Sequence, residues 1–292
     1  MAMRLFWWAL LFCLATAQAA VVGRIEAAGG QYGRQDDAGT SKPAILNGVV
    51  EAGDTLITGQ GGWMVLAMSD GASLTLRPNT QLRIDEYRYQ AEQASESRAW
   101  LRLVRGALRS VTGLIGQSNR PSYRLATPTM TIGIRGTDHE TVLQDHSADA
   151  DTPAGVYEWV HDGESVMQVA GQELAVRPGE SGYLPVGDGA LPRLLAQRPR
   201  LFERLQQFGR EQGLDQILER LHDRGERGFR ARPLSPEQRE QLIEQGRQAV
   251  RERMEALPPG QKPDREQVQK AVKQRLQKLE RPPTLPRKRV GG

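Results

Sequence analysis

Leu-Ala-Thr-Pro-Thr-Met-Thr-Ile-Gly-Ile-Arg-Gly-Thr-Asp-His-Glu-Thr-Val-Leu, residues 125–143, has the most regular strand pattern in the chain. Met130, Ile132 and Ile134 alternate with polar or small residues, the period of two expected of a strand with one buried face. Gly136 then interrupts the run, as a bulge or a tight bend requires. We therefore predict a strand that buries its isoleucines and ends at Gly136.

The polar residues beyond Gly136 are the candidate partner-binding site. Asp138, His139 and Glu140 follow the glycine almost directly. We expect Asp138 and Glu140 to be largely solvent-facing, because they lie past the end of the buried strand. If they form a recognition surface, changing them should weaken partner binding and leave stability nearly unchanged.

The same residues belong to the densest group of candidate metal ligands. Histidine and carboxylate side chains suit a divalent metal, but the spacing matches neither H-E-x-x-H nor an EF-hand loop. The nucleophile motif G-x-S-x-G is also absent from the sequence. We therefore expect a solvated acidic loop, with no catalytic residue, no metal site and no cofactor. The group comprises Asp138, His139, Glu140, Asp145, His146, Asp149, Asp151 and His161.

Short strands separated by turns extend over residues 20–189, the predicted β domain. Strand patterns recur at short intervals, and Gly113–Pro121 is predicted to be a loop. Val156–Val160 and Ser165–Val169, joined by a turn at Gly163, are predicted to form a hairpin. This spacing predicts an all-β sandwich, barrel or solenoid and disfavours a parallel sheet with crossover helices.

From residue 190 the hydrophobic period becomes helical, and we predict a basic α-helical region over residues 190–285. Leu201, Phe202, Leu205 and Phe208 fall on one helix face. Residues 21–190 carry 14 basic and 21 acidic side chains, whereas residues 191–292 carry 24 basic and 14 acidic. We therefore expect a boundary near Gly189, and helices that are either loosely docked or partly disordered. Further helices are predicted over 235–257 and from 264 to about 280, and a disordered tail over 286–292.

The first 19 residues have the pattern of a secretory signal peptide. Arg4 precedes the apolar run Leu5–Ala15, and Ala17-Gln18-Ala19 is a small-x-small cleavage site. No stretch reaches the roughly 20 apolar residues that a membrane-spanning helix needs. Cys13 is the only cysteine, so the mature chain has neither a disulfide nor a thiolate metal site. We expect a periplasmic protein without a transmembrane anchor.

Several sequence blocks resemble the FecR-domain family over residues 49–141. The family implies a β-rich sandwich or solenoid-like extracytoplasmic domain with a binding or sensing role and no catalytic residues. Its best-known members are membrane-spanning regulators that relay signals from an outer-membrane transporter to a cytoplasmic sigma factor. This sequence differs in lacking the anti-sigma and transmembrane segments, and it has His139 where the family pattern has an apolar or aromatic residue. The matching blocks are Gly53-Asp54, Leu56-x-Thr58-Gly59, Ser69-Asp70-Gly71-x-Ser73-Leu74-Thr75-Leu76, Pro78-Asn79-x-x-Leu82-x-Ile84, Leu101–Gly106, Thr127-Pro128 and Gly136-Thr137.

These features together predict a non-enzymatic FecR-domain protein that binds or senses an envelope protein or cell-wall component, in signalling or as a scaffold. The alternatives are a carbohydrate- or peptidoglycan-binding module and, less favoured, a metal-dependent hydrolase. We do not expect nucleic acid as a partner, because acidic residues interleave the arginines of the helical region and export is expected. The sequence leaves the oligomeric state open. Aromatic residues in the strands fit either a core or a glycan-stacking groove: Trp63, Trp100, Tyr123, Tyr157, Trp159 and Tyr183.

Overall fold

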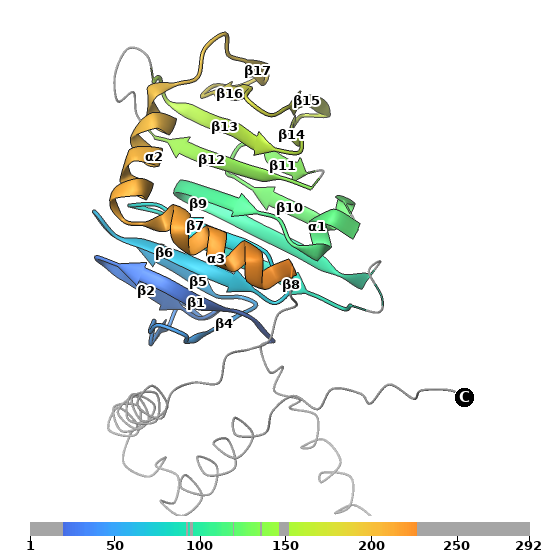
Figure 1. Ribbon diagram of the computed structural model, residues 1–292. Coiled ribbons are helices and arrows are strands. Elements are labelled where there is room, and N and C mark those ends of the chain that lie inside the picture. Colours follow the sequence, from blue (N-terminus) through green and yellow to red (C-terminus); the bar gives the residue numbers. More distant parts are fainter. Residues whose placement is uncertain are drawn as a thin grey trace, which may run out of the picture. The chain divides into compact units, whose positions relative to one another are not determined.

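In the part of the chain that the structure describes, the protein is mainly β, with helices after the strands, as the sequence predicts (Figure 1). The computed structural model describes residues 20–91, 93, 96–118, 120–134, 136–145 and 152–226. The strands are β1 (Val21–Gly29), β2 (Tyr32–Gln35), β3 (Ser41–Lys42), β4 (Val49–Glu51), β5 (Thr55–Thr58), β6 (Trp63–Met68), β7 (Ser73–Leu76), β8 (Gln81–Arg88), β9 (Arg98–Val111), β10 (Tyr123–Ala126), β11 (Thr131–Ile134), β12 (Asp138–Gln144), β13 (Gly155–Asp162), β14 (Ser165–Val169), β15 (Gln172–Val176), β16 (Ser181–Pro185) and β17 (Arg193–Leu194). The helices are α1 (Leu114–Ser118), the 3-10 turn η2 (Arg120–Ser122), α2 (Arg200–Glu211) and α3 (Leu214–Glu226), so the predicted loop at 113–121 contains α1 and η2.

The strands form two layers that share the long strand β9. Sheet A has the order β4-β1-β6-β7-β9-β12-β13-β16-β17. Sheet B has the order β3-β2-β5-β8-β9-β10-β11-β14-β15. Strand β9 passes from sheet B to sheet A at Gly106, whose φ of 85° favours glycine. A side chain there would also meet the backbone of Thr80, because an added Cβ would lie 2.5 Å from its Cα.

Two further glycines mark corners where the chain changes sheet. Gly136, at a φ of 62°, lies between β11 of sheet B and β12 of sheet A, and Gly163, at 78°, lies between β13 and β14. The corners touch so closely that a Cβ on Gly163 would lie 1.7 Å from the carbonyl oxygen of Gly136. The predicted β13–β14 hairpin is therefore wrong: β13 pairs with β12 and β16, whereas β14 pairs with β11 and β15.

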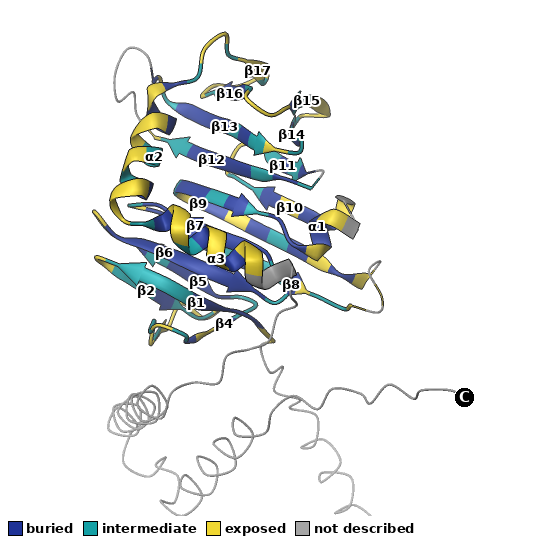
Figure 2. Cartoon of the chain, in the orientation of Figure 1, coloured by how far each residue is buried: buried dark blue, intermediate teal, exposed yellow. Residues whose placement is uncertain are grey.

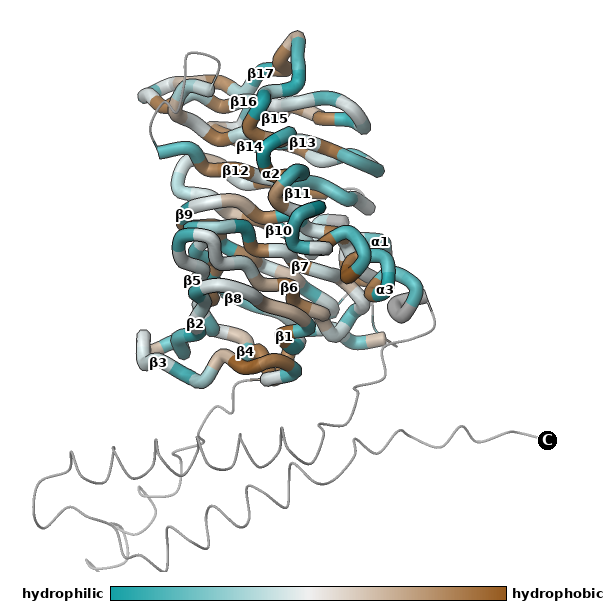
Figure 3. The backbone as a smooth tube through the Cα atoms, turned by 60° about the vertical axis from the view of Figure 1, so that its left-hand side comes forward, coloured by the Kyte–Doolittle hydropathy of each residue, from teal (hydrophilic) through white to brown (hydrophobic). Residues whose placement is uncertain are grey.

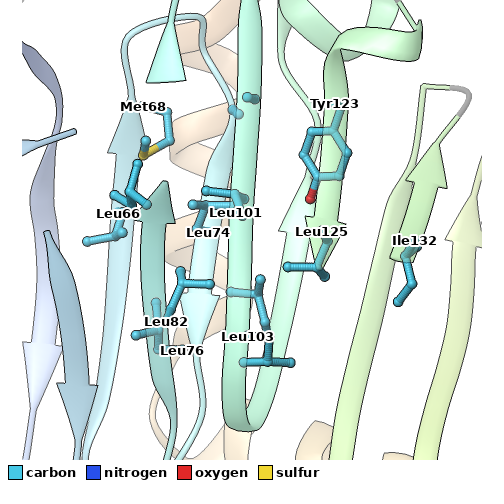
Figure 4. Packing of buried hydrophobic residues seen from close by; sticks show 14 of the residues in the cluster. Leu66, Met68, Leu74, Leu76, Leu82, Leu101, Leu103, Tyr123, Leu125 and Ile132 are labelled. Atoms are coloured by element: carbon cyan, nitrogen blue, oxygen red, sulfur yellow. The ribbon is translucent and has the colours of Figure 1, made fainter. Parts of the chain in front are cut away.

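The main hydrophobic core lies between the two sheets (Figure 4). Ile132 and Ile134 are buried, as is Met130 just before β11, which confirms the burial predicted from the alternation. Along the strands, hydrophobic positions alternate with hydrophilic ones (Figure 3), as expected where one strand face is buried.

Helices α2 and α3 pack on the outer face of sheet A, and each keeps an exposed stripe on its far side (Figure 2). Phe202 of α2 packs against Tyr157 and Tyr183, and Leu214 of α3 belongs to a cluster with Trp63. The hydrophobic stripe predicted for this region therefore packs on the β layer.

Helices α2 and α3 follow the boundary predicted near Gly189 and pack on sheet A, and the boundary itself stays a prediction. The predicted signal peptide, the helices at 235–257 and 264–280 and the tail at 286–292 lie outside the described residues. No helix in the described part of the chain is long and apolar enough to cross a membrane.

Candidate functional site

The three predicted site residues lie on β12 and point in two directions. His139 is fully buried between the sheets, whereas Asp138 and Glu140 face the helix-covered side of sheet A. Asp138 is partly exposed, but Glu140 has no exposed surface. The expectation that Glu140 is solvent-facing is therefore wrong. Glu140 is buried because β12 starts almost immediately after the Gly136 corner and continues beneath α2.

Glu140 forms a buried ion pair with Arg77, which follows β7. Both Nε and Nη2 of Arg77 lie 2.9 Å from Oε1 of Glu140, and Arg77 is only 2% exposed. Helix α2 crosses this pair at Gly209, where an added Cβ would lie 2.9 Å from Nη1 of Arg77. Nη1 of Arg77 and Oε2 of Glu140 have no hydrogen-bond partner among the described residues.

The surrounding charges keep Glu140 ionised. Burial by itself would raise the pKa of Glu140, but the charge of Arg77, the neighbouring His161 and the charge of Arg109 together lower it below its ordinary value. The Nε2 atom of His161 lies 3.9 Å from Oε2 of Glu140. The pair therefore holds two opposite charges beneath a docked helix.

His139 belongs to a second buried network, between the sheets. Its Nδ1 lies 2.8 Å from Oε1 of Glu158, and the hydroxyl of Thr141 donates to Oε2 of Glu158 at 2.6 Å. The hydroxyl of Tyr123 donates to Ser110 at 2.9 Å, and burial raises the pKa of Tyr123 well above its usual value. All of these groups are buried. The network therefore stabilises the packing between the sheets and offers no surface to a partner.

An open groove of about 680 Å³ lies beside Asp138, bounded by the ends of β7, β9 and β12 and by α1 and α3. Its lining is strongly acidic. It contains one guanidinium, from Arg109, and five carboxylates, those of Asp70, Asp138, Asp162, Asp215 and Glu219. Val111, Leu114 and Leu218 add apolar surface to the same groove.

Two groove carboxylates already neutralise Arg109. Its Nε and Nη2 donate to the two oxygens of Asp138 at 3.0 and 2.8 Å, and Nη1 lies 3.5 Å from Asp215. Burial would lower the pKa of Arg109, but Asp138, Glu140 and Asp215 raise it. Asp162 and Glu219 are exposed and make no ion pair with any residue in the described ranges. The groove therefore presents uncompensated negative charge.

The residues considered as candidate metal ligands are dispersed in the structure. Asp138 lines the groove, His139 is in the core, and His161 lies beside Glu140. His146, Asp149 and Asp151 lie outside the described residues. Within the part of the chain that the structure describes, no three histidine, cysteine or carboxylate side chains are grouped to hold a metal ion.

Sequence reasoning missed the partners that define these sites. Arg77 pairs with Glu140 across 63 positions, and Glu158 lies 19 positions from His139. Asp215 and Glu219 reach the groove from α3, which follows the predicted β domain. One signal was available: a charged residue within an alternating strand, such as Glu158 between Tyr157 and Trp159, requires a partner if its face is buried.

Comparison with known proteins identifies the β region. Residues 54–158 match the model of the family described as FecR protein, from the residue before β5 into β13. No curated protein matches the sequence significantly.

Two crystal structures of a candidate anti-sigma factor from Parabacteroides distasonis ATCC 8503, at 2.50 and 1.65 Å resolution, are similar in part. Each is 10% identical, with a TM-score of 0.38, over 50% of this chain and 61% of the other. The chain thus spans less than two thirds of the length of those structures. The family match covers Arg77, Glu140 and Glu158, and it confirms the predicted resemblance. The chain therefore contains a FecR domain, which spans residues 54–158.

Proposed function

We propose that this chain is an exported, non-enzymatic binding module that holds a basic segment of an envelope protein in the groove beside Asp138. The observation that supports this is the lining of the groove, where Asp162 and Glu219 stay unpaired among the described residues and the single guanidinium is already neutralised by Asp138 and Asp215. Complementary charge steers association and selects partners. The exposed Leu114 adds an apolar contact for the same segment.

The binding role accords with the FecR domain, whose family implies sensing and no catalytic residues. In such a role Asp138 contributes both to the groove wall and to holding Arg109 in place. His139, through Glu158, and Glu140, through Arg77, hold the strand from its two opposite faces. Of the three residues predicted to contact a partner, Asp138 is therefore the one assigned to direct contact.

Neutralising the two unpaired groove carboxylates should weaken binding without affecting the fold. For Asp162→Asn with Glu219→Gln we expect a loss of about 2- to 30-fold for a Lys- and Arg-rich synthetic peptide, since exposed charge pairs contribute about 0.2–1 kcal/mol each. Titration calorimetry at low and high salt measures this, and the wild-type affinity should fall with salt.

The matched control removes two carboxylates elsewhere, by Asp188→Asn with Glu203→Gln, both exposed and outside the groove. It should bind like the wild type. If the control loses as much affinity as the groove variant, net charge and not the groove determines binding. If neither variant loses affinity, the proposed site is wrong.

Export is a separate expectation, based on the signal pattern of residues 1–19. The mature protein should begin at Ala20, with Val21 as the alternative, and should be recovered from a periplasmic extract. Intact-mass measurement after osmotic shock tests both points, with the cytoplasmic fraction as the control. Full-length chain confined to the cytoplasm would refute the proposed compartment and, with it, an envelope partner.

A further inference from the structure

The outer side of sheet B carries a trough of about 450 Å³ over β10, β11 and β14. Its floor includes Gly133, where an added Cβ would meet no atom within 4 Å. The missing side chain therefore leaves an open hollow in the strand surface. The walls are polar as well as apolar: Arg124, Thr131, Val166, Gln168 and Glu173.

Trp100 lies against two guanidinium groups, and one of them, that of Arg124, belongs to the lining of the trough. Arg124 is paired in register with Trp100 of β9, and its guanidinium carbon lies 5.4 Å from the Trp100 ring centroid. The guanidinium carbon of Arg98 lies 5.5 Å from the same centroid. Such cation–π contacts hold the cation in place while leaving its N–H groups available.

The two arginines are short of acidic partners. Arg124 is exposed and makes no hydrogen bond or ion pair with any residue in the described ranges. Arg98 has one carboxylate nearby, that of Glu86, at 3.9 Å. A guanidinium presents donors in a fork that matches a carboxylate. This side of the trough is therefore equipped to bind an anion.

The opposite wall of the trough carries side chains that can form hydrogen bonds with the hydroxyl groups of a ligand. The amide nitrogen of Gln168 donates to Glu173 at 2.9 Å, which orients the side chain and leaves the amide oxygen as an acceptor. The hydroxyl of Thr131 both donates and accepts. Val166 offers apolar surface to the C–H face of a ring. The volume lies within the usual range for ligand sites.

We propose that this trough binds a carboxylate-bearing sugar of an acidic polysaccharide, with Arg124 on the carboxylate and Gln168 and Thr131 on the ring hydroxyls. The other aromatic residues considered for a glycan groove do not provide such a surface. Trp63, Tyr123, Tyr157 and Tyr183 are buried, and Trp159 is covered by Arg198, at 4.3 Å from its ring. The trough lies on sheet B, so it is separate from the groove beside Asp138 on sheet A.

The test measures binding of a galacturonate hexamer to the full chain by titration calorimetry. Two probes serve as comparisons: maltohexaose, which is neutral, and a hexaglutamate peptide, which has the charge without the sugar. Arg124→Ala removes the anion contact, and Gly133→Val fills the trough with a side chain that suits a strand. Arg210→Ala, exposed on α2, is the matched control for loss of one arginine.

The expected result is that the galacturonate hexamer binds at least tenfold more tightly than either comparison probe, and that Arg124→Ala and Gly133→Val each lose about tenfold or more. Arg210→Ala should bind like the wild type. Circular dichroism and melting curves should show both trough variants folded. If hexaglutamate binds as tightly as the galacturonate hexamer, the site attracts anions without recognising a sugar, and the proposal is wrong. Absence of hexamer binding, or full binding by folded Gly133→Val, would overturn the proposal.

Discussion

Glu140→Ala is expected to lower the free energy of unfolding by about 3–5 kcal/mol, the typical result of removing one partner from a buried ion pair. The guanidinium of Arg77 would remain buried beneath α2, only 2% exposed, with one of its nitrogens already lacking a partner among the described residues. Measured against a typical total of about 5–15 kcal/mol, this is a large loss. Urea unfolding followed by circular dichroism measures it.

Two controls separate the buried charge from other effects. Asp138→Ala, on the same strand face but partly exposed, leaves Arg109 paired with Asp215 and should lose about 1 kcal/mol or less. The double variant Arg77→Met with Glu140→Leu removes both charges and should be much closer to the wild type than Glu140→Ala. A Glu140→Ala protein within 1 kcal/mol of the wild type would show that the pair is not buried in solution.

The same pair predicts a dependence on acid. Because the folded-state pKa of Glu140 lies below its ordinary value of 4.5, its contribution to stability is complete above pH 4.5 and is lost as the pH falls through the lower, folded-state value. The difference in unfolding free energy between the wild type and the charge-free double variant should therefore be constant above pH 4.5. Below that pH the wild type should lose stability relative to the double variant. A difference that changes only near neutral pH would point to another group.

Ile134→Asp is expected to prevent the folded chain from accumulating. Ile134 is 3% exposed, and its Cδ1 atom fills the space over Gly116 of α1, 2.6 Å from where a Cβ on that glycine would lie. Burial of such a side chain is worth about 1.5–3 kcal/mol, and an unpaired buried carboxylate costs several kcal/mol more. The soluble yield and the melting curve measure the effect.

Gly133→Asp is the matched control, one residue earlier on the opposite strand face, where a Cβ meets nothing within 4 Å. It should stay folded, since the new carboxylate points to solvent. Ile134→Val removes only one methylene group from the same position and should lower the free energy of unfolding by about 0.5–1.5 kcal/mol. A stable Ile134→Asp protein would contradict the assignment of this face to the core.

Local patterns were enough to predict the strands and the identity of the domain. The alternation at Met130, Ile132 and Ile134 identified the buried face of β11, and the turn and strand blocks identified the FecR domain. Both signals depend on residues that are close together in the chain. For the same reason they could not assign β13 and β14 to different sheets: a turn glycine such as Gly163 serves a hairpin and a corner equally well.

The amino-acid sequence by itself determined the mainly β fold, the helical stripe on α2 and α3 and the buried isoleucines, because periods of two and 3.6 residues are set by local backbone geometry. Only the tertiary structure decided that α2 covers Glu140, that Arg77 neutralises it, and that α3 brings Asp215 and Glu219 to the groove beside Asp138. Those contacts join segments 63 or more residues apart. Whether a charged side chain meets water or a partner depends on what folds over it, and no local pattern carries that information.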